Sequence, residues 1–142
     1  MIKIEMGQLQ PNTPFMSVFS KVSRYDKFGT KTLYRLTKLA RKLNKEMRTI
    51  ADLRMKLVNE YAQKDESGKF IPMMNEKGEP IPNTFTIPDA LQEEWGKKME
   101  EFQKTEIEID LDPIPLNLVK DEGFNISTQE ALILEPILSM EE

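Results

Sequence analysis

Residues Thr30 to Gln63 read TKTLYRLTKLARKLNKEMRTIADLRMKLVNEYAQ. The stretch contains no Pro or Gly, and Thr30 or Thr32 is suited to cap its first turn. Its apolar residues recur at spacings of four and three, with Arg54 as the one polar interruption. They are Leu36, Ala40, Leu43, Met47, Ile50, Leu57 and Tyr61. At about 1.5 Å per residue, the pattern predicts one helix roughly 50 Å long.

A helix of this length needs another element along its apolar face. We expect the segment from Pro88 to Lys104, which has an apolar stripe at helical spacing and acidic residues largely off it. The stripe consists of Leu91, Trp95, Met99 and Phe102. Charge favours the same pairing, because Lys21–Lys64 carries a net of +9 and Asp65–Glu142 a net of −13. We therefore predict an antiparallel helix hairpin, with the charges of the basic helix paired within the chain or between subunits.

Two short segments alternate apolar and charged residues, as half-buried strands do. They are Ile2–Met6 and Glu106–Leu111. A lone strand is not stable, so we expect these two to pair in an antiparallel sheet at one end of the hairpin. A short helix is predicted for Phe15–Tyr25, and Asp112–Pro115 is expected to end regular pairing. The predicted fold class is α+β.

The segment 69–87 is rich in proline and joins the two long helices. Asn75–Gly78 has the composition of a turn, so we expect an exposed, mobile ribbon with a hairpin. We detect no internal repeat. Near the C-terminus, Ser127–Glu130 is a capping-box pattern that predicts a short helix, which Pro136 ends. Ile137 and Leu138 are expected to fold back onto the core. The chain is interpreted as one domain, 1–142, with the parts 1–28, 30–63, 69–87, 88–104 and 106–142.

Composition argues against catalysis. The 142 residues include neither His nor Cys, which removes the commonest general base, thiolate nucleophiles and the usual transition-metal ligands. No glycine-rich nucleotide motif or serine nucleophile turn is present. No apolar run approaches the ~20 residues of a membrane span, and no secretory signal is visible. We expect an intracellular, non-enzymatic protein with no cofactor.

One row of carboxylates is a candidate cation site. Glu106, Glu108 and Asp110 would lie on one face of the predicted strand, with Asp112 just beyond it. Oxygen ligands suit Ca²⁺ or Mg²⁺. The alternative, which we favour, is a solvated strand face whose like charges discourage edge-to-edge aggregation. No metal is therefore predicted.

Six basic residues of the long helix are candidate phosphate contacts: Arg35, Lys38, Arg41, Lys42, Lys45 and Arg48. Three features argue against a nucleic-acid partner. The chain is acidic overall, no aromatic residue is interleaved with the cations, and a complementary acidic helix lies in the same chain. A nucleic-acid-binding accessory protein is kept as the alternative function.

Two apolar groups are candidate contact residues. In the ribbon, Phe70, Met73 and Met74, with Trp95 nearby in sequence, would form either an adaptable docking surface or ordinary core under the helices. In the long helix, the stripe extends well beyond what the second helix covers, which predicts a homo-oligomer with Leu43, Met47 and Ile50 among its contacts.

The order of these motifs resembles a group of small, uncharacterised proteins encoded by tailed bacteriophages and prophages. The resemblance rests on a helix that ends Leu57-Val58-Asn59-Glu60-Tyr61-Ala62 and a connector, Lys64-Asp65-Glu66-Ser67-Gly68-Lys69. An acidic helix and the strand Glu106-Ile107-Glu108-Ile109 follow, and the proline-rich insert Pro72–Pro88 is a departure. The resemblance implies a viral protein that acts by binding, in virion assembly or on a host protein as in anti-defence, located in the host cytoplasm or the virion. It supplies no catalytic residues.

Overall fold

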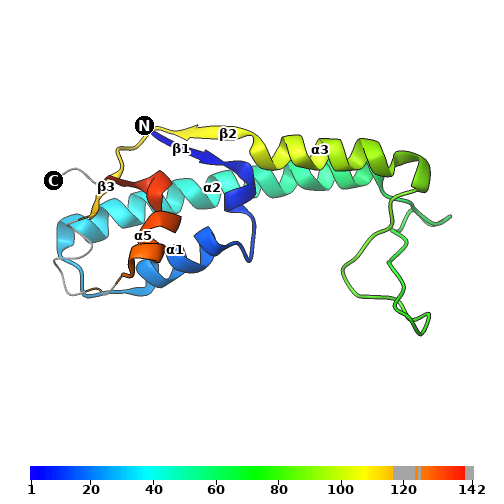
Figure 1. Cartoon of the computed structure of the whole chain (residues 1–142), viewed down its shortest axis with the longest axis horizontal. Helices are drawn as coiled ribbons and strands as arrows, with labels where there is room; N and C mark the ends of the chain where they lie inside the picture. The colour runs from blue at the N-terminus through cyan, green and yellow to red at the C-terminus, as the bar shows by residue number, and fades with distance from the viewer. Residues whose placement is uncertain (117–123, 125, 140–142) are drawn as a thin grey trace. The chain divides into compact units, whose positions relative to one another are not determined.

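The computed structural model describes residues 1–116, 124 and 126–139 (Figure 1). Its fold is α+β, which confirms the predicted class. The helices are α1 (Pro14–Arg24), α2 (Thr30–Tyr61), α3 (Gln92–Lys104) and α5 (Thr128–Ile133). The strands are β1 (Ile2–Glu5), β2 (Glu106–Ile109), β3 (Ile114–Pro115) and β4 (Leu138–Ser139). Single 3₁₀ turns lie at Met6–Leu9, Asp89–Leu91 and Glu135–Ile137.

The chain packs as two compact units. The first contains Met1–Ala51 and the described residues from Gln103 onward, and the second contains Asp52–Phe102. Helices α2 and α3 each contribute residues to both units. The interpretation as one domain therefore stays a prediction.

Helix α2 ends two residues before the predicted boundary. The apolar stripe is on its protected side, since its members are buried or half-buried. Leu39, Val58 and the hydroxyl residue Thr32 are also buried, although the four-and-three spacing does not include them. The buried side of α2 is therefore wider than the predicted stripe.

The predicted pairing of the first and late strands is confirmed in the first unit (Figure 1). Strands β1 and β2 are antiparallel, with Ile2 opposite Ile109 and Ile4 opposite Ile107. Ile2, Ile4 and Ile109 are buried, whereas the charged residues between them are exposed. The alternation places one face of the sheet in the core and the other in solvent.

Two capped helices complete the first unit. Thr13 caps α1, because its hydroxyl oxygen accepts a hydrogen bond from the Met16 amide at 3.2 Å. Ser127 and Glu130 form the predicted capping box of α5. Lys21 of α1 pairs with Glu130 at 3.0 Å, which joins the two helices. The Ser127 amide and then the Lys21 ammonium hold the pKa of the Glu130 carboxyl below its ordinary value.

One predicted boundary of the sheet structure is wrong. We expected Asp112–Pro115 to end regular pairing, but Ile114–Pro115 pairs in parallel with Leu138–Ser139. Pro115 has no N–H to donate, and the pairing extends over only two residues. The fold-back of Ile137 and Leu138 onto the core is confirmed, since both are buried.

In the second unit, α3 runs antiparallel to the end of α2 (Figure 1). The helix predicted from Pro88 begins instead with the 3₁₀ turn Asp89–Leu91. Its predicted stripe is confirmed, because Phe102 is buried and the other three members are half-buried, whereas the glutamates beside them are exposed.

The ribbon between these helices contains an internal repeat that our sequence analysis missed. Residues 65–72, DESGKFIP, and residues 75–82, NEKGEPIP, are identical at four of eight positions. Each copy forms the same hairpin, closed by a bridge between Lys64 and Phe70 in one and between Met74 and Pro80 in the other. The predicted turn at Asn75–Gly78 is thus the second of two.

The two turns have the same pattern of hydrogen bonds. The Oδ1 atom of Asp65 accepts from the amides of Ser67 and Lys69, at 2.9 and 3.0 Å. The Oδ1 atom of Asn75 accepts from the equivalent amides two and four residues later, both at 2.9 Å. The Ser67 hydroxyl, followed by backbone amides, holds the pKa of the Asp65 carboxyl below its usual value. An Asp or Asn at the first turn position therefore organises each hairpin.

Within the residues described, no helix combines the length and the apolar character needed to cross a membrane.

Candidate functional site

The candidate carboxylate row lies on the solvent side of the sheet. Strand β2 carries Glu106 and Glu108, and Asp110 and Asp112 follow it; all four are exposed. Across the sheet, Glu108 lies opposite Lys3 and Glu106 opposite Glu5. No three acidic side chains among the described residues gather closely enough to hold a metal ion. The row therefore offers no built cation site.

The predicted phosphate contacts do share one face of α2, in the first unit. Lys38, Arg41, Lys42, Lys45 and Arg48 are exposed and Arg35 is half-buried. Lys31, also exposed, extends the same face toward the start of the helix. We call these seven residues the basic face. Between Thr30 and Ala51 the only acidic residue is Glu46, so this part of α2 carries a net charge of +6.

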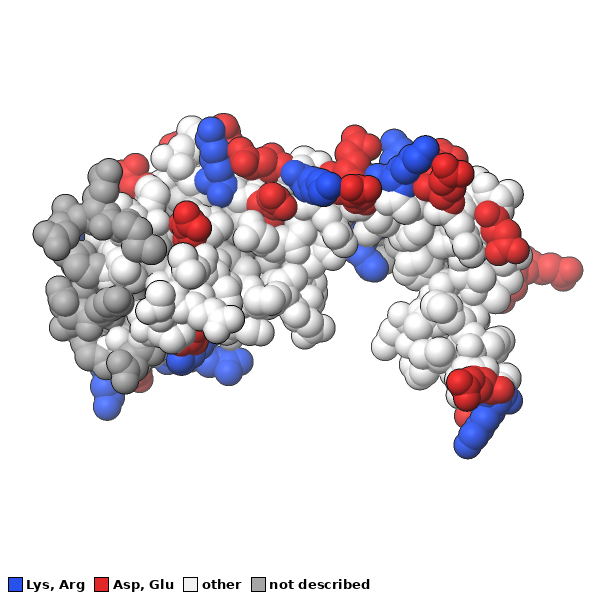
Figure 2. Space-filling view, in the orientation of Figure 1, with Lys and Arg blue, Asp and Glu red and all other residues white. Residues whose placement is uncertain are grey.

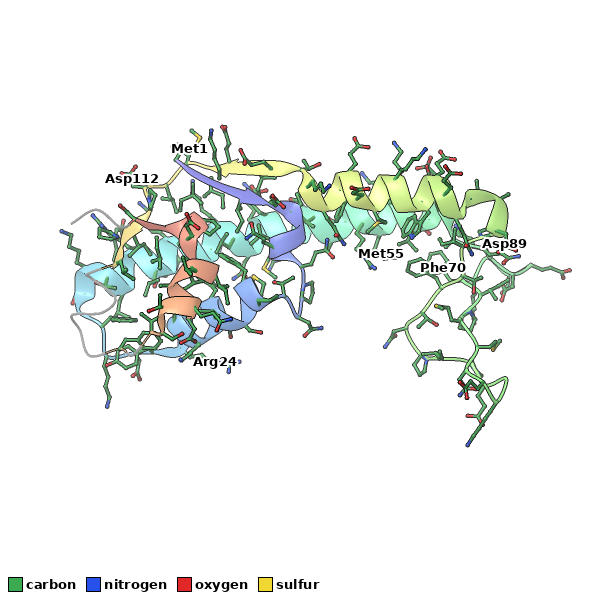
Figure 3. All side chains as sticks on the ribbon, viewed as in Figure 1. Met1, Arg24, Met55, Phe70, Asp89 and Asp112 are labelled. Carbon is green, nitrogen blue, oxygen red and sulfur yellow. The ribbon has the colours of Figure 1, made fainter. Side chains whose placement is uncertain are left out.

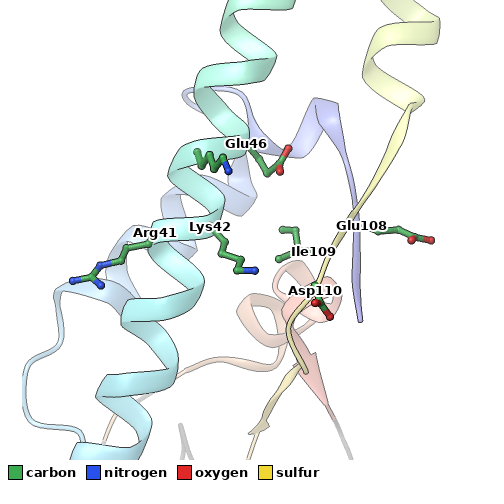
Figure 4. A pocket seen from close by; sticks show the side chains of 7 residues that line it. Arg41, Lys42, Glu46, Glu108, Ile109 and Asp110 are labelled. Atoms are coloured by element: carbon green, nitrogen blue, oxygen red, sulfur yellow. The ribbon is translucent and has the colours of Figure 1, made fainter.

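The predicted charge pairing of the basic helix does not occur within the described part of the chain. None of the seven cations forms an ion pair with a residue that the structure describes. A pocket of about 410 Å³ lies between α2 and β2. In Figure 4, Lys42 points toward Ile109 and Asp110, which line it. Arg41 points away from the strand. The basic face thus keeps most of its charge available to solvent.

An aromatic side chain does lie among these cations, contrary to our sequence interpretation. Tyr34 is 64% exposed, and the Lys38 Nζ atom lies 5.3 Å from its ring centroid. The signal was present in the sequence: Tyr34 is three residues from Lys31 and four from Lys38, which places it on their helix face. The lack of an interleaved aromatic therefore no longer argues against nucleic acid.

The stripe residues predicted to contact a second subunit lie mostly in the chain's own core. Leu43 is 1% exposed and Ile50 is 3% exposed, whereas Met47 is half-buried. For Leu43 and Ile50 the predicted contact role is wrong, because side chains already covered by the first unit are not open to a partner. Homo-oligomer formation itself stays a prediction.

The apolar ribbon residues divide between the two alternatives we considered. Phe70 is half-buried at the base of the ribbon (Figure 3), with the Lys64 Nζ atom 5.6 Å from its ring centroid. Met73 and Met74 are 53% and 56% exposed. Ile81 of the second hairpin, whose amide donates to the Met73 carbonyl at 2.8 Å, is exposed as well. Phe70 therefore belongs to the packed base, and the two methionines are open to solvent.

Next to these residues, the second unit contains an open pocket of about 500 Å³. We call it the ribbon pocket. Its lining is more apolar than polar, with Met73, Thr84, Phe85 and Ile87 on the ribbon and Trp95 on α3. Trp95 was predicted as a member of the apolar stripe of α3 and, with the ribbon residues, as a candidate for a docking surface. An apolar pocket with a few polar groups is the usual form of a binding site.

The indole of Trp95 is held in place by two other rings. Its ring centroid is 5.6 Å from those of both Tyr61 and Phe85. The Tyr61 hydroxyl donates a hydrogen bond to the Glu94 Oε1 atom at 2.8 Å. This bond, together with burial and the negative charges of Glu94 and Glu60, raises the pKa of Tyr61 to about 12. The pocket wall is thus fixed by aromatic packing and one strong hydrogen bond.

The surroundings of the ribbon pocket are acidic. From Asn75 to Glu94 the chain has five acidic residues and one Lys, and all six are exposed. Over the rest of α3, acidic and basic side chains are mixed, as Figure 2 shows. Electrostatics at this pocket therefore favour a partner that places positive charge around an apolar group.

Comparison of the chain with protein-family models, with curated proteins and with solved structures found no match.

Proposed function

We propose that the chain is a non-enzymatic, phage-type protein that acts by binding another protein. It would serve in virion assembly or as an inhibitor or modulator of a host protein, in the host cytoplasm or the virion. The phage origin rests on the sequence resemblance alone. Binding is supported by one observation above all: an open, mainly apolar pocket lined by exposed Met73, with exposed Met74 next to it in the chain.

The chemistry of the ribbon pocket suggests the kind of partner. A fixed indole and phenyl ring suit an apolar side chain that packs against them in the pocket, as at the centre of many interfaces. Methionine side chains adapt to irregular shapes, so Met73 and Met74 would cover the inserted group. The exposed acidic residues around the pocket favour lysine or arginine on either side of it. We therefore propose a protein segment with an apolar anchor flanked by basic residues.

Affinity capture from infected bacterial cells tests this function. The wild-type chain is compared with a Met73→Glu/Met74→Glu double variant and with Leu132→Glu, a control at an exposed leucine of the first unit. We expect the wild type and the control to capture the same partner and the double variant to lose it. Capsid or tail proteins would indicate assembly, and a single bacterial protein would indicate host modulation. Equal capture by all three chains would contradict the proposal.

A further inference from the structure

We propose that the basic face of α2 binds single-stranded nucleic acid, with one base stacked on Tyr34 and neighbouring phosphates held by lysine and arginine. This goes beyond the proposed protein binding and uses a separate surface in the first unit. It rests on three observations: the unpaired cations, the exposed ring among them, and a pocket beside that ring.

The cations are arranged as a continuous surface for a phosphate chain. From Lys31 to Arg48 the helix rises about 26 Å, at ~1.5 Å per residue. The cations recur every one to four residues over that length, on one side of α2. Because no described acidic residue pairs with them, a phosphate would not have to displace a partner from the described part of the chain. The length corresponds to roughly four nucleotides, at the lower end of the site sizes found for single-strand binders.

The exposed ring points to an unpaired base. Tyr34 lines a pocket of about 310 Å³ with three cations of the basic face, Lys31, Arg35 and Lys38. This volume is near the lower limit of about 300 Å³ for small-ligand sites, so it suits one base. A base can stack on a tyrosine only when it is not paired in a duplex. With Lys38 held above the ring, the phosphate next to a stacked base would meet a cation.

The opposite wall of this pocket distinguishes a base from an acidic protein. It is formed by Leu111 and Asp112, which lie between β2 and β3, and by Ile114 of β3 (Asp112 is labelled in Figure 3). The Asp112 carboxylate can accept a hydrogen bond from the amino group of a base. The same carboxylate would repel an aspartate or glutamate that approached the cations. Apolar side chains beside it suit the flat face of a base.

Fluorescence anisotropy with the full-length chain tests the proposal. The probes are dye-labelled oligo-dC and oligo-rC of about 20 nucleotides, whose bases carry the amino group that Asp112 would accept from, a duplex of equal length, and a poly-glutamate peptide as competitor. With about four phosphate contacts, the affinity for the single strands should fall roughly 50-fold between about 50 and 200 mM salt. Comparison of the two oligonucleotides shows whether DNA or RNA is preferred.

Three variants separate stacking from general charge attraction. Tyr34→Ala should weaken single-strand binding by about 5- to 150-fold, and Tyr34→Phe should retain it, because the phenyl ring still stacks. Arg41→Glu/Arg48→Glu should weaken binding and reduce the salt slope by about 1.4. The matched control is Lys98→Glu, which makes the same charge change at an exposed lysine of α3 in the second unit and should have no effect. Circular dichroism establishes that each variant keeps its helix content.

Several results would overturn the proposal. The first is that the single strands do not bind at the lowest salt. The second is equal affinity for duplex and single strand, with the affinity of Tyr34→Ala unchanged. The third is that poly-glutamate displaces the oligonucleotides at equal charge concentration. The last result would assign the basic face to an acidic protein. Because Met73→Glu/Met74→Glu changes only the second unit, its effect on protein capture is measured separately, so either proposal can fail without the other.

Discussion

Tyr61 connects the end of α2 to α3 inside the second unit by two kinds of contact. Its ring packs on Trp95, and its hydroxyl donates to Glu94 at 2.8 Å. Ionisation of the phenol would break this hydrogen bond and place a negative charge beside Glu94 and Glu60. These are the causes that raise the pKa of Tyr61 to about 12.

The raised pKa predicts how stability depends on pH. Below the ordinary value of 10, the phenol is protonated in both the folded and the unfolded chain, so its contribution is fully present. Between pH 10 and about 12 the unfolded phenol ionises and the folded one does not, so stability falls. In urea unfolding, the free energy of unfolding should decrease across this pH range, and Tyr61→Phe should remove the part of the decrease that is due to Tyr61. Identical pH dependence in the two chains would contradict the assignment.

At the scale of elements, the tandem hairpins depend on one glycine each. Gly68 and Gly78 have φ angles of 84° and 76°, in the left-handed region that residues with a Cβ atom avoid. Gly96, by contrast, lies inside α3, and a Cβ atom there would meet nothing within 4 Å. The three glycines therefore predict opposite effects of the same substitution.

Gly68→Ala and Gly78→Ala should each lower the free energy of unfolding of the second unit by about 1–2 kcal/mol. Gly96→Ala should raise it by up to ~1 kcal/mol, because alanine is the better helix former. Fluorescence of Trp95, the single tryptophan, follows unfolding of this unit directly. If Gly68→Ala and Gly96→Ala changed the free energy of unfolding in the same direction, the result would contradict the described turns.

The elements also show what the sequence could and could not predict. The long helix was predictable because 34 residues without Pro or Gly keep one apolar period. The pairing of β3 with β4 was not predictable, because a strand of two residues is too short to show an alternating pattern and one of the two is Pro115. The hairpin repeat was missed because half of its positions differ, and its common feature is an Asp or Asn side chain that caps the turn. At the candidate surfaces, the cations and methionines were predicted, whereas the exposure of Tyr34 and Trp95's place in the pocket wall depend on tertiary packing.

For the whole molecule, the main feature is that positive charge lies on one surface, whereas negative charge and exposed apolar groups lie together on another. The part of α2 that carries the basic face, Thr30–Ala51, has a net charge of +6, whereas the region around the ribbon pocket is acidic and has exposed methionines. Surfaces of opposite charge on copies of one chain attract each other, and exposed apolar groups add to association.

This arrangement supports the prediction of a homo-oligomer, although not through Leu43 or Ile50. Light scattering at micromolar concentration should give a mass above the 16.5 kDa of one chain, and the excess should decrease at high salt. Met73→Glu/Met74→Glu should also decrease the excess mass if the ribbon residues contribute to self-association. A mass that stays at 16.5 kDa at every concentration would exclude self-association.

The most direct test of protein binding through the ribbon pocket is hydrogen exchange of the chain with and without its captured partner. We predict slower exchange of backbone amides at Met73–Met74 and Ile81–Ile87, since the partner would exclude water from the pocket and order the hairpins around it. Amides of the first unit should be unchanged by this partner. Protection confined to the first unit, with the ribbon exchanging as fast as in the free chain, would contradict the account.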